Sequence, residues 1–152
     1  MRNKKIANYL IWKPKTLATR RNLQTHALES YEEQLSVFDS MSLADQKKML
    51  AHTLAELEAM PAQFEKLRRA WLARDLAELQ KVSNEQMPAN DPAAERLMED
   101  LLDKRNHKML QRMQPRLQEG RAFIAVGALH LPGEQGLLNL LEQRGYRVEA
   151  VY

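Results

Sequence analysis

The stretch Phe123-Ile-Ala-Val-Gly-Ala-Leu-His-Leu-Pro-Gly133 lies within residues 120–152, which contain all the glycines of this chain. Its apolar run at 123–126 is rich in strand-forming residues and ends at Gly127, which is typical of a short buried strand. After Gly133, leucines follow a helical period up to Arg144-Gly145, where a helix is expected to end. Residues 146–151 then alternate in type and predict a second strand. Together these features indicate a βαβ unit with parallel strands and a right-handed crossover.

The preceding residues are mainly helical in pattern. Residues 24–28 predict a short strand, and Ser30-Tyr-Glu-Glu33 is a capping box that starts a helix through Phe38. Apolar periodicity predicts further helices over 42–60, 61–74 and 75–82, a loop over 83–92 and a longest helix over 93–117, with a kink before Pro115. The expected fold class is therefore α/β but α-rich: a small sheet with a C-terminal strand-helix-strand unit, packed against several long helices.

Length and composition indicate a basic N-terminal arm at 1–22 and a single domain at 23–152. Within the arm, residues 6–12 are expected to dock as a helix turn or an edge strand. The net charge of +3 comes from basic and acidic residues interleaved along helices, which argues against nucleic-acid binding. The absence of cysteine excludes thiol catalysis. No apolar run is long enough for a membrane span, and the N-terminus makes a poor signal peptide, so the default expectation is a cytoplasmic protein.

Three polar residues occupy positions that favour a site. His130 follows the carboxyl end of the first predicted strand, where open α/β sheets bind ligands, and Gly127 lets the backbone approach a ligand there. Glu29 lies at the end of another predicted strand, beside a helix N-terminus that favours a carboxylate. The alternatives are an ordinary loop histidine and a glutamate that only complements the helix dipole.

Arg105 and Asn106 interrupt the apolar stripe of the longest helix, between leucines at 101 and 102 and the apolar pair at 109 and 110. A buried unpaired guanidinium is costly, so two readings are open. Arg105 either snorkels to solvent or points inward to a carboxylate or bound anion, with Asn106 satisfying nearby backbone groups.

With these residues in view, the sequence resembles the TraB/GumN family, which is related to the TIKI metalloproteases and more loosely to ChaN and erythromycin-esterase-like proteins. The motifs that carry the resemblance appear in the family's order over about residues 20–152: Leu28-Glu-Ser-Tyr-Glu-Glu-Gln-Leu35, Arg105-Asn-x-x-Met109, Gly127-Ala-Leu-His-Leu-Pro-Gly133 and Gly145-Tyr-x-Val148. The resemblance implies a divalent-metal hydrolase acting on a peptide or small molecule, with manganese or cobalt favoured over zinc. It implies that His130 and Glu29 are metal ligands, with Glu29 acting as ligand or base. It also implies that Arg105 and Asn106 form a polar wall in which Arg105 stabilises developing negative charge.

The family's N-terminal half has no counterpart in residues 1–19, which contain neither glycine nor histidine. The first G-x-x-H motif is therefore missing. The one imidazole and one carboxylate that remain are fewer than the three protein ligands usual at a catalytic zinc site. Two functions follow as hypotheses. The first is a truncated metal hydrolase whose site is completed by a homodimer or by a complementing N-terminal-half chain. The second is an interaction or regulatory protein that retains the fold and uses no cofactor.

Overall fold

A computed structural model of the chain describes residues 16–88 and 90–151. These residues form helices joined by turns and extended segments, in this order: α2 (Tyr31–Asp39), α3 (Leu43–Ala55), α4 (Met60–Ala73), α5 (Leu76–Glu85), α6 (Pro92–Met98), the π-helix η1 (Glu99–Asp103), α7 (Lys104–Glu119), the 3₁₀ turn η2 (Ala128–His130) and α8 (Leu137–Gln143). Residues 16–20 add a helical turn before α2. The expectation for residues 6–12 lies outside the described residues.

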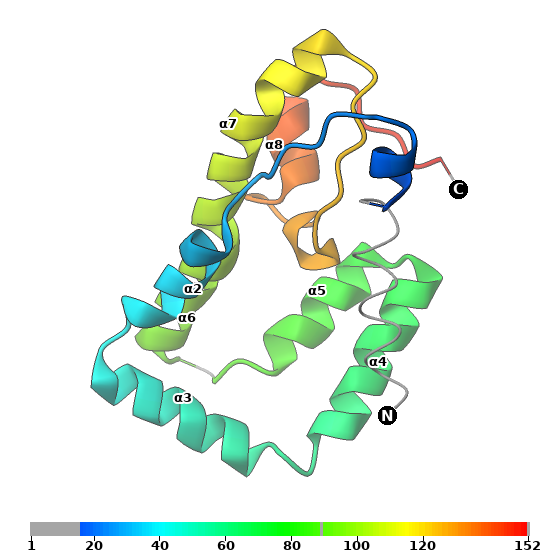
Figure 1. The fold of residues 1–152 in the computed structure, drawn as a ribbon. Coiled ribbons are helices and arrows are strands. Elements are labelled where there is room, and N and C mark those ends of the chain that lie inside the picture. The colour runs from blue at the N-terminus through cyan, green and yellow to red at the C-terminus, as the bar shows by residue number, and fades with distance from the viewer. Residues whose placement is uncertain (1–15, 89, 152) are drawn as a thin grey trace.

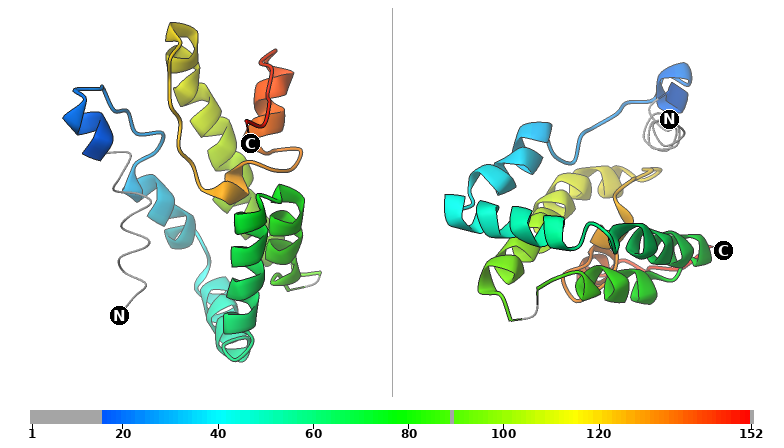
Figure 2. Two further views of the ribbon diagram at one scale, coloured as in Figure 1. Left: turned by 90° about the vertical axis from the view of Figure 1, so that its right-hand side faces the viewer. Right: turned by 90° about the horizontal axis from the view of Figure 1, so that it is seen from below.

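The helices are arranged as an open frame (Figure 1). Helix α7 forms one long side, α3 the base and α4 the opposite side, with α5 packed beside α4. Two further views show the same arrangement, with α3 standing apart from α7 and α8 (Figure 2). None of the described helices is both long and apolar enough to cross a bilayer.

The α/β prediction is wrong, because residues 16–88 and 90–151 contain no β-strand. The expected strands at 24–28, 123–126 and 146–151 are extended segments that form no backbone ladder. The prediction that 123–126 is fully buried is also wrong, because burial alternates there: Ile124 and Val126 pack against the core, whereas Phe123 is 83% exposed. Alternation reports an extended chain with one buried face, but a sheet also needs a neighbouring strand to pair its N–H and C=O groups. The local pattern does not specify that neighbour.

Most helix predictions are confirmed. Ser30 and Glu33 form the expected capping box, with Ser30 Oγ accepting from the Glu33 N–H and the Glu33 carboxylate accepting from the Ser30 N–H. The longest predicted helix is helical throughout 92–119 and keeps Pro115 inside α7. Its interruption is instead the π-helical segment η1, a wider turn that often occurs at functional positions.

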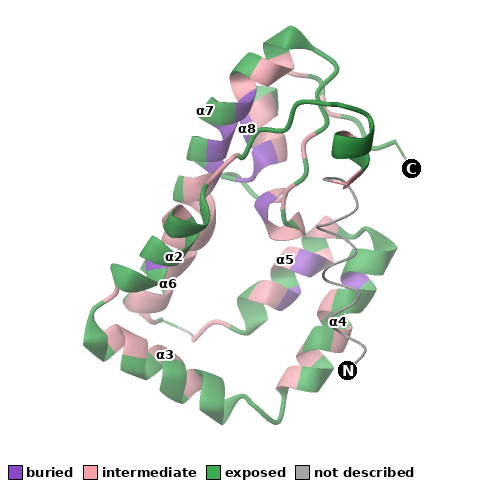
Figure 3. Cartoon of the chain, in the orientation of Figure 1, coloured by how far each residue is buried: buried purple, intermediate pink, exposed green. Residues whose placement is uncertain are grey.

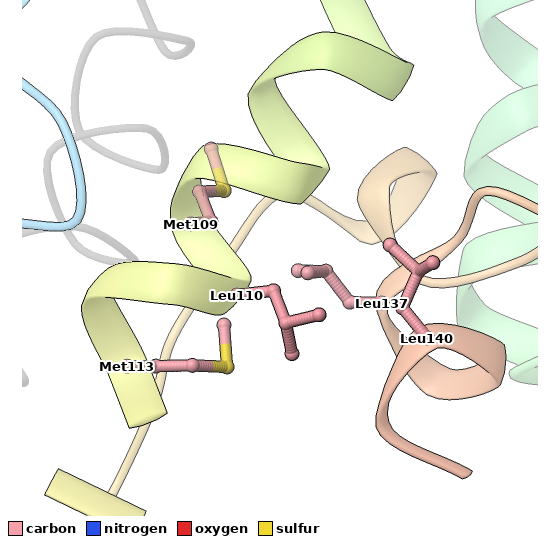
Figure 4. Close-up of a cluster of buried hydrophobic side chains, with 5 residues drawn as sticks. All are labelled: Met109, Leu110, Met113, Leu137 and Leu140. Carbon is pink, nitrogen blue, oxygen red and sulfur yellow. The ribbon is translucent and has the colours of Figure 1, made fainter. Parts of the chain in front are cut away.

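The core lies between α7 and α8, where the apolar faces of the two helices meet (Figure 4). Its buried side chains are Met109, Leu110, Met113, Leu137 and Leu140. Leu28, Ile124 and Val126 cover its edge, so the extended segments are held by side-chain packing. Burial is concentrated in α7, α8, η2 and α5, and α3 has no buried residue (Figure 3).

Candidate functional site

Arg105 points inward from α7 and forms a two-pronged ion pair with Glu29. Its Nε and Nη2 donate to the two carboxylate oxygens at 2.8 and 2.6 Å. The two side chains are only 15% and 13% exposed. The planar guanidinium matches a carboxylate in this geometry, which makes such hydrogen bonds stronger than neutral ones. Of the two readings of Arg105, the structure shows the inward one.

The π-helix η1 helps to hold this arginine. Arg105 Nη1 donates to the Leu101 carbonyl at 2.8 Å, within the widened turn that precedes α7. A π turn shifts the regular i+4 pairing of the helix, so a carbonyl there becomes available to a side chain. Three of the guanidinium's nitrogens are thus satisfied, and the charge is tolerated in a largely apolar stripe.

Asn106, on the next position of α7, links two loop segments. Its Nδ2 donates to the Gln135 carbonyl at 2.7 Å, and its Oδ1 lies 2.7 Å from His130 Nδ1. A carbonyl only accepts, so the amide must present its NH₂ to Gln135 and its oxygen to the imidazole. His130 Nδ1 therefore carries the hydrogen, and the neutral ring has its lone pair on Nε2. Asn106 is 1% and His130 7% exposed.

His130 is the last residue of η2, the turn that begins at Gly127. Gly127 has an ordinary extended backbone, with φ −63° and ψ 141°, and the side chain of His130 is its close neighbour. A Cβ built at Gly127 would lie 3.5 Å from His130 Cδ2, which is normal van der Waals contact. The predicted binding role of Gly127 stays a prediction.

The electrostatics of the cluster fix the charge of each group. The hydrogen bond from Arg105 lowers the pKa of Glu29, although partial burial opposes the shift. Burial lowers the pKa of His130, and the nearby Arg105 charge acts in the same direction. At neutral pH the cluster therefore holds a carboxylate, a guanidinium and a neutral imidazole.

The sequence predictions missed Arg112, which ties α2 to α7. Its Nη1 and Nη2 donate to the Glu33 carboxylate at 2.7 and 2.6 Å, and Nη1 also donates to the Leu28 carbonyl at 2.7 Å. Gln34 adds a hydrogen bond to Glu29 at 3.2 Å. Arg112 follows Arg105 by two helical turns and so shares its face, a spacing that could have indicated the second pair.

Two pockets flank the cluster. Glu29 and Arg105 line a pocket of about 290 Å³ between α2 and α7, together with basic side chains of α7. Asn106 lines a second pocket of about 230 Å³ beside α5 and the 132–136 loop. His130 and Gly127 line neither of these pockets. The four polar residues predicted for the site thus lie in one cluster, but they do not share one pocket.

The cluster does not fit the divalent metal that the resemblance implies. Both oxygens of Glu29 accept hydrogen bonds from Arg105, so the lone pair of His130 Nε2 is what these two residues still offer to a metal ion. Residues 16–88 and 90–151 contain no group of three His, Cys, Asp or Glu side chains placed to hold a metal. The remaining positions, 1–15, 89 and 152, contain none of these residue types. Catalytic sites in proteins usually supply three protein ligands to zinc.

With this geometry established, comparison with known proteins gives one match. The sequence profile of the TraB/PrgY/gumN family matches residues 14–150. No curated protein and no solved structure matches the chain.

Proposed function

The chain belongs to the TraB/PrgY/gumN family, and we propose that within this family it acts by binding a partner and does not catalyse a reaction on its own. The observation that carries the proposal is the closed state of the polar cluster. Glu29 gives both oxygens to Arg105, and Asn106 fixes His130 through Nδ1. In this role the cluster holds the segment before α2 and the 127–136 loop against α7.

The exposed surface supports a partner-binding role. The chain exposes 12194 Å², whereas a compact monomer of 17.6 kDa exposes about 7,900 Å². The excess is about 4,300 Å². Large apolar side chains are part of this exposed surface, and contiguous exposed apolar patches mark interaction sites.

Helix α3 is where apolar surface is most clearly uncovered. It buries none of its residues, although leucines recur on it at helical spacing. The exposed leucines of α3 and the turn after it are Leu43, Leu50, Leu54 and Leu57. An apolar row on one helix face binds best to the apolar face of a partner helix. The partner that fits is therefore a protein with an amphipathic helix.

Calorimetric titration with Mn²⁺, Co²⁺ and Zn²⁺ tests the proposal on the native chain and on His130→Ala. We expect no saturable binding that depends on His130. Binding at a one-to-one ratio that disappears in His130→Ala would contradict the proposal. His52→Ala is the matched control, because His52 lies on α3 and its ring hydrogen-bonds to the Gln86 carbonyl.

A second candidate function is the metal-dependent hydrolase that the family resemblance implies. One observation favours it: His130 is neutral, and its Nε2 has no hydrogen-bond partner among the described residues. An imidazole oriented through Nδ1 is the usual form of a metal-binding histidine. In this case a second chain has to supply the missing donors, and Glu29 has to leave Arg105. The same titration, repeated in the presence of the complementing chain, separates the two candidates.

A further inference from the structure

The extended segment at residues 146–151 carries backbone groups, from residue 147 onward, that pair with no other described backbone group. It follows α8 through Gly145, whose positive φ of +84° turns the chain out of the helix. Among the described residues, no N–H or C=O group of residues 147–151 bonds to another backbone group. Unpaired backbone groups in an extended chain are a template for another strand.

Side-chain burial alternates over residues 146–149, as in a strand, whereas Ala150 and Val151 are both exposed. Tyr146 and Val148 are partly buried, whereas Arg147, Glu149 and Val151 are exposed. Arg147 and Glu149 lie on the same face and pair with each other at 3.0 Å, with side chains 84% and 61% exposed. Both charges are therefore accessible to a strand that approaches the edge.

We propose that residues 146–151 pair with the same residues of a second copy of this chain, as antiparallel strands related by a two-fold axis at Val148. In this register Arg147 lies opposite Glu149 of the second copy, and Glu149 lies opposite its Arg147. Opposite charges at directly facing positions stabilise antiparallel strands. A two-fold interface is self-complementary, so one pairing rule produces two favourable contacts.

Charge selects this register over its neighbours. Because the two-fold axis relates identical faces, the register can change only in steps that keep outward residues facing outward. A shift in one direction places Arg147 opposite Arg147 of the second copy. A shift in the other direction places Glu149 opposite its Glu149. Both neighbouring registers set like charges against each other, which destabilises the pairing.

This inference is independent of the role proposed for the polar cluster, because it depends only on residues 145–151. Failure of self-association would leave the metal titration unchanged as a test of that role. Conversely, metal binding at His130 would not bear on the strand edge.

Light scattering after size exclusion, over a range of protein concentrations, tests the pairing on the full chain. We expect the native chain to dimerise. Arg147→Glu alone and Glu149→Arg alone each set two like-charged pairs against each other, and should weaken dimerisation by roughly tenfold or more. Arg144→Glu is the matched control, since it changes charge at an exposed position outside the paired segment.

Mixing the two charge variants gives the decisive result. A chain with Arg147→Glu carries two acidic residues and a chain with Glu149→Arg two basic residues, so the mixed pair regains both favourable contacts. Native mass spectrometry should show a heterodimer in the mixture that exceeds either homodimer. A native chain that stays monomeric overturns the proposal, as does a dimer that neither charge variant weakens or a mixture that forms no heterodimer.

Discussion

Glu29 and Arg105 lie 76 positions apart in sequence, yet they meet through two hydrogen bonds of 2.8 and 2.6 Å in a largely enclosed position. The pair holds the segment before α2 against the start of α7. Asn106 extends this link to His130 and Gln135. Polar residues from three motifs that lie far apart in the sequence therefore meet in the folded chain.

Arg105→Met should destabilise the fold by about 2–3 kcal/mol, because it leaves the Glu29 carboxylate enclosed without its partner. Urea denaturation measures the change in the free energy of unfolding. Arg69→Met is the matched control, since its ion pair with Glu65 is exposed and should contribute little to stability. The double variant Glu29→Met with Arg105→Met should recover part of the loss. Equal stability of Arg105→Met and the native chain would contradict this assignment.

Asn106→Asp should raise the pKa of His130. The new carboxylate would accept from Nδ1 and favour the charged imidazolium, which opposes the effect of burial. It would also leave the Gln135 carbonyl without its donor, at a cost of about 1–3 kcal/mol. NMR titration of the His130 ring protons measures the shift. An unchanged or lower pKa in the variant would show that Asn106 does not orient the ring.

The pH dependence of stability should reflect the same histidine. Burial lowers the pKa of His130 below its usual 6.5, so below that pH the unfolded chain binds a proton that the folded chain does not. This contribution to stability is complete above about pH 6.5 and is lost as the pH falls through the folded value. Glu29 and Glu33 have pKa values below 4.5, and Arg112 lowers that of Glu33 to about 2, so their contributions are lost only below about pH 4.5.

Thermal melts between pH 4.5 and 7.5 separate these two ranges. We expect the melting temperature of the native chain to decrease as the pH is lowered from 7.5 to 4.5. In His130→Gln the dependence should flatten, because no group remains there to bind the extra proton. A slope that persists in His130→Gln would assign the effect to another group.

The outcome of the sequence predictions follows from how local each signal is. Helices are encoded by neighbours along the chain, so the capping box at Ser30 and the stripe around Met109 were sufficient to place α2 and α7. Strands require a partner that the local sequence does not name, and 123–126 and 146–151 remain extended without one. The inward direction of Arg105 could be foreseen as one of two outcomes because an arginine in an apolar stripe needs compensation. The hydrogen bond from Arg105 to the Leu101 carbonyl could not be predicted, because it depends on the π turn η1.

The exposed leucines of α3 should contribute little to folding. Leu50 and Leu54 are 59% and 61% exposed, so Leu50→Gln with Leu54→Gln should change the free energy of unfolding by less than about 1 kcal/mol. Leu110→Ala, in the core, should cost about 2–5 kcal/mol. The variant with Leu50→Gln and Leu54→Gln should bind less of an apolar fluorescent dye than the native chain. A large loss of stability would mean that α3 is covered within the monomer, and the proposed partner surface would be lost.

The two glycines that bracket the His130 turn should respond differently to alanine. Gly127 has a backbone that any residue adopts, and a new Cβ would only touch the His130 ring at 3.5 Å, so Gly127→Ala should change stability by less than about 1 kcal/mol. Gly133 has φ +89°, and a Cβ there would lie 2.7 Å from Gln80 Nε2, so Gly133→Ala should cost about 1–2 kcal/mol. Combining Gly133→Ala with Gln80→Ala removes the contact with Gln80 and leaves the backbone strain. Urea denaturation of Gly133→Ala, Gln80→Ala and the double variant separates the cost of the contact from the cost of the strain. If Gly127→Ala proves the more damaging change, the 127–130 turn must adopt a conformation other than the one described.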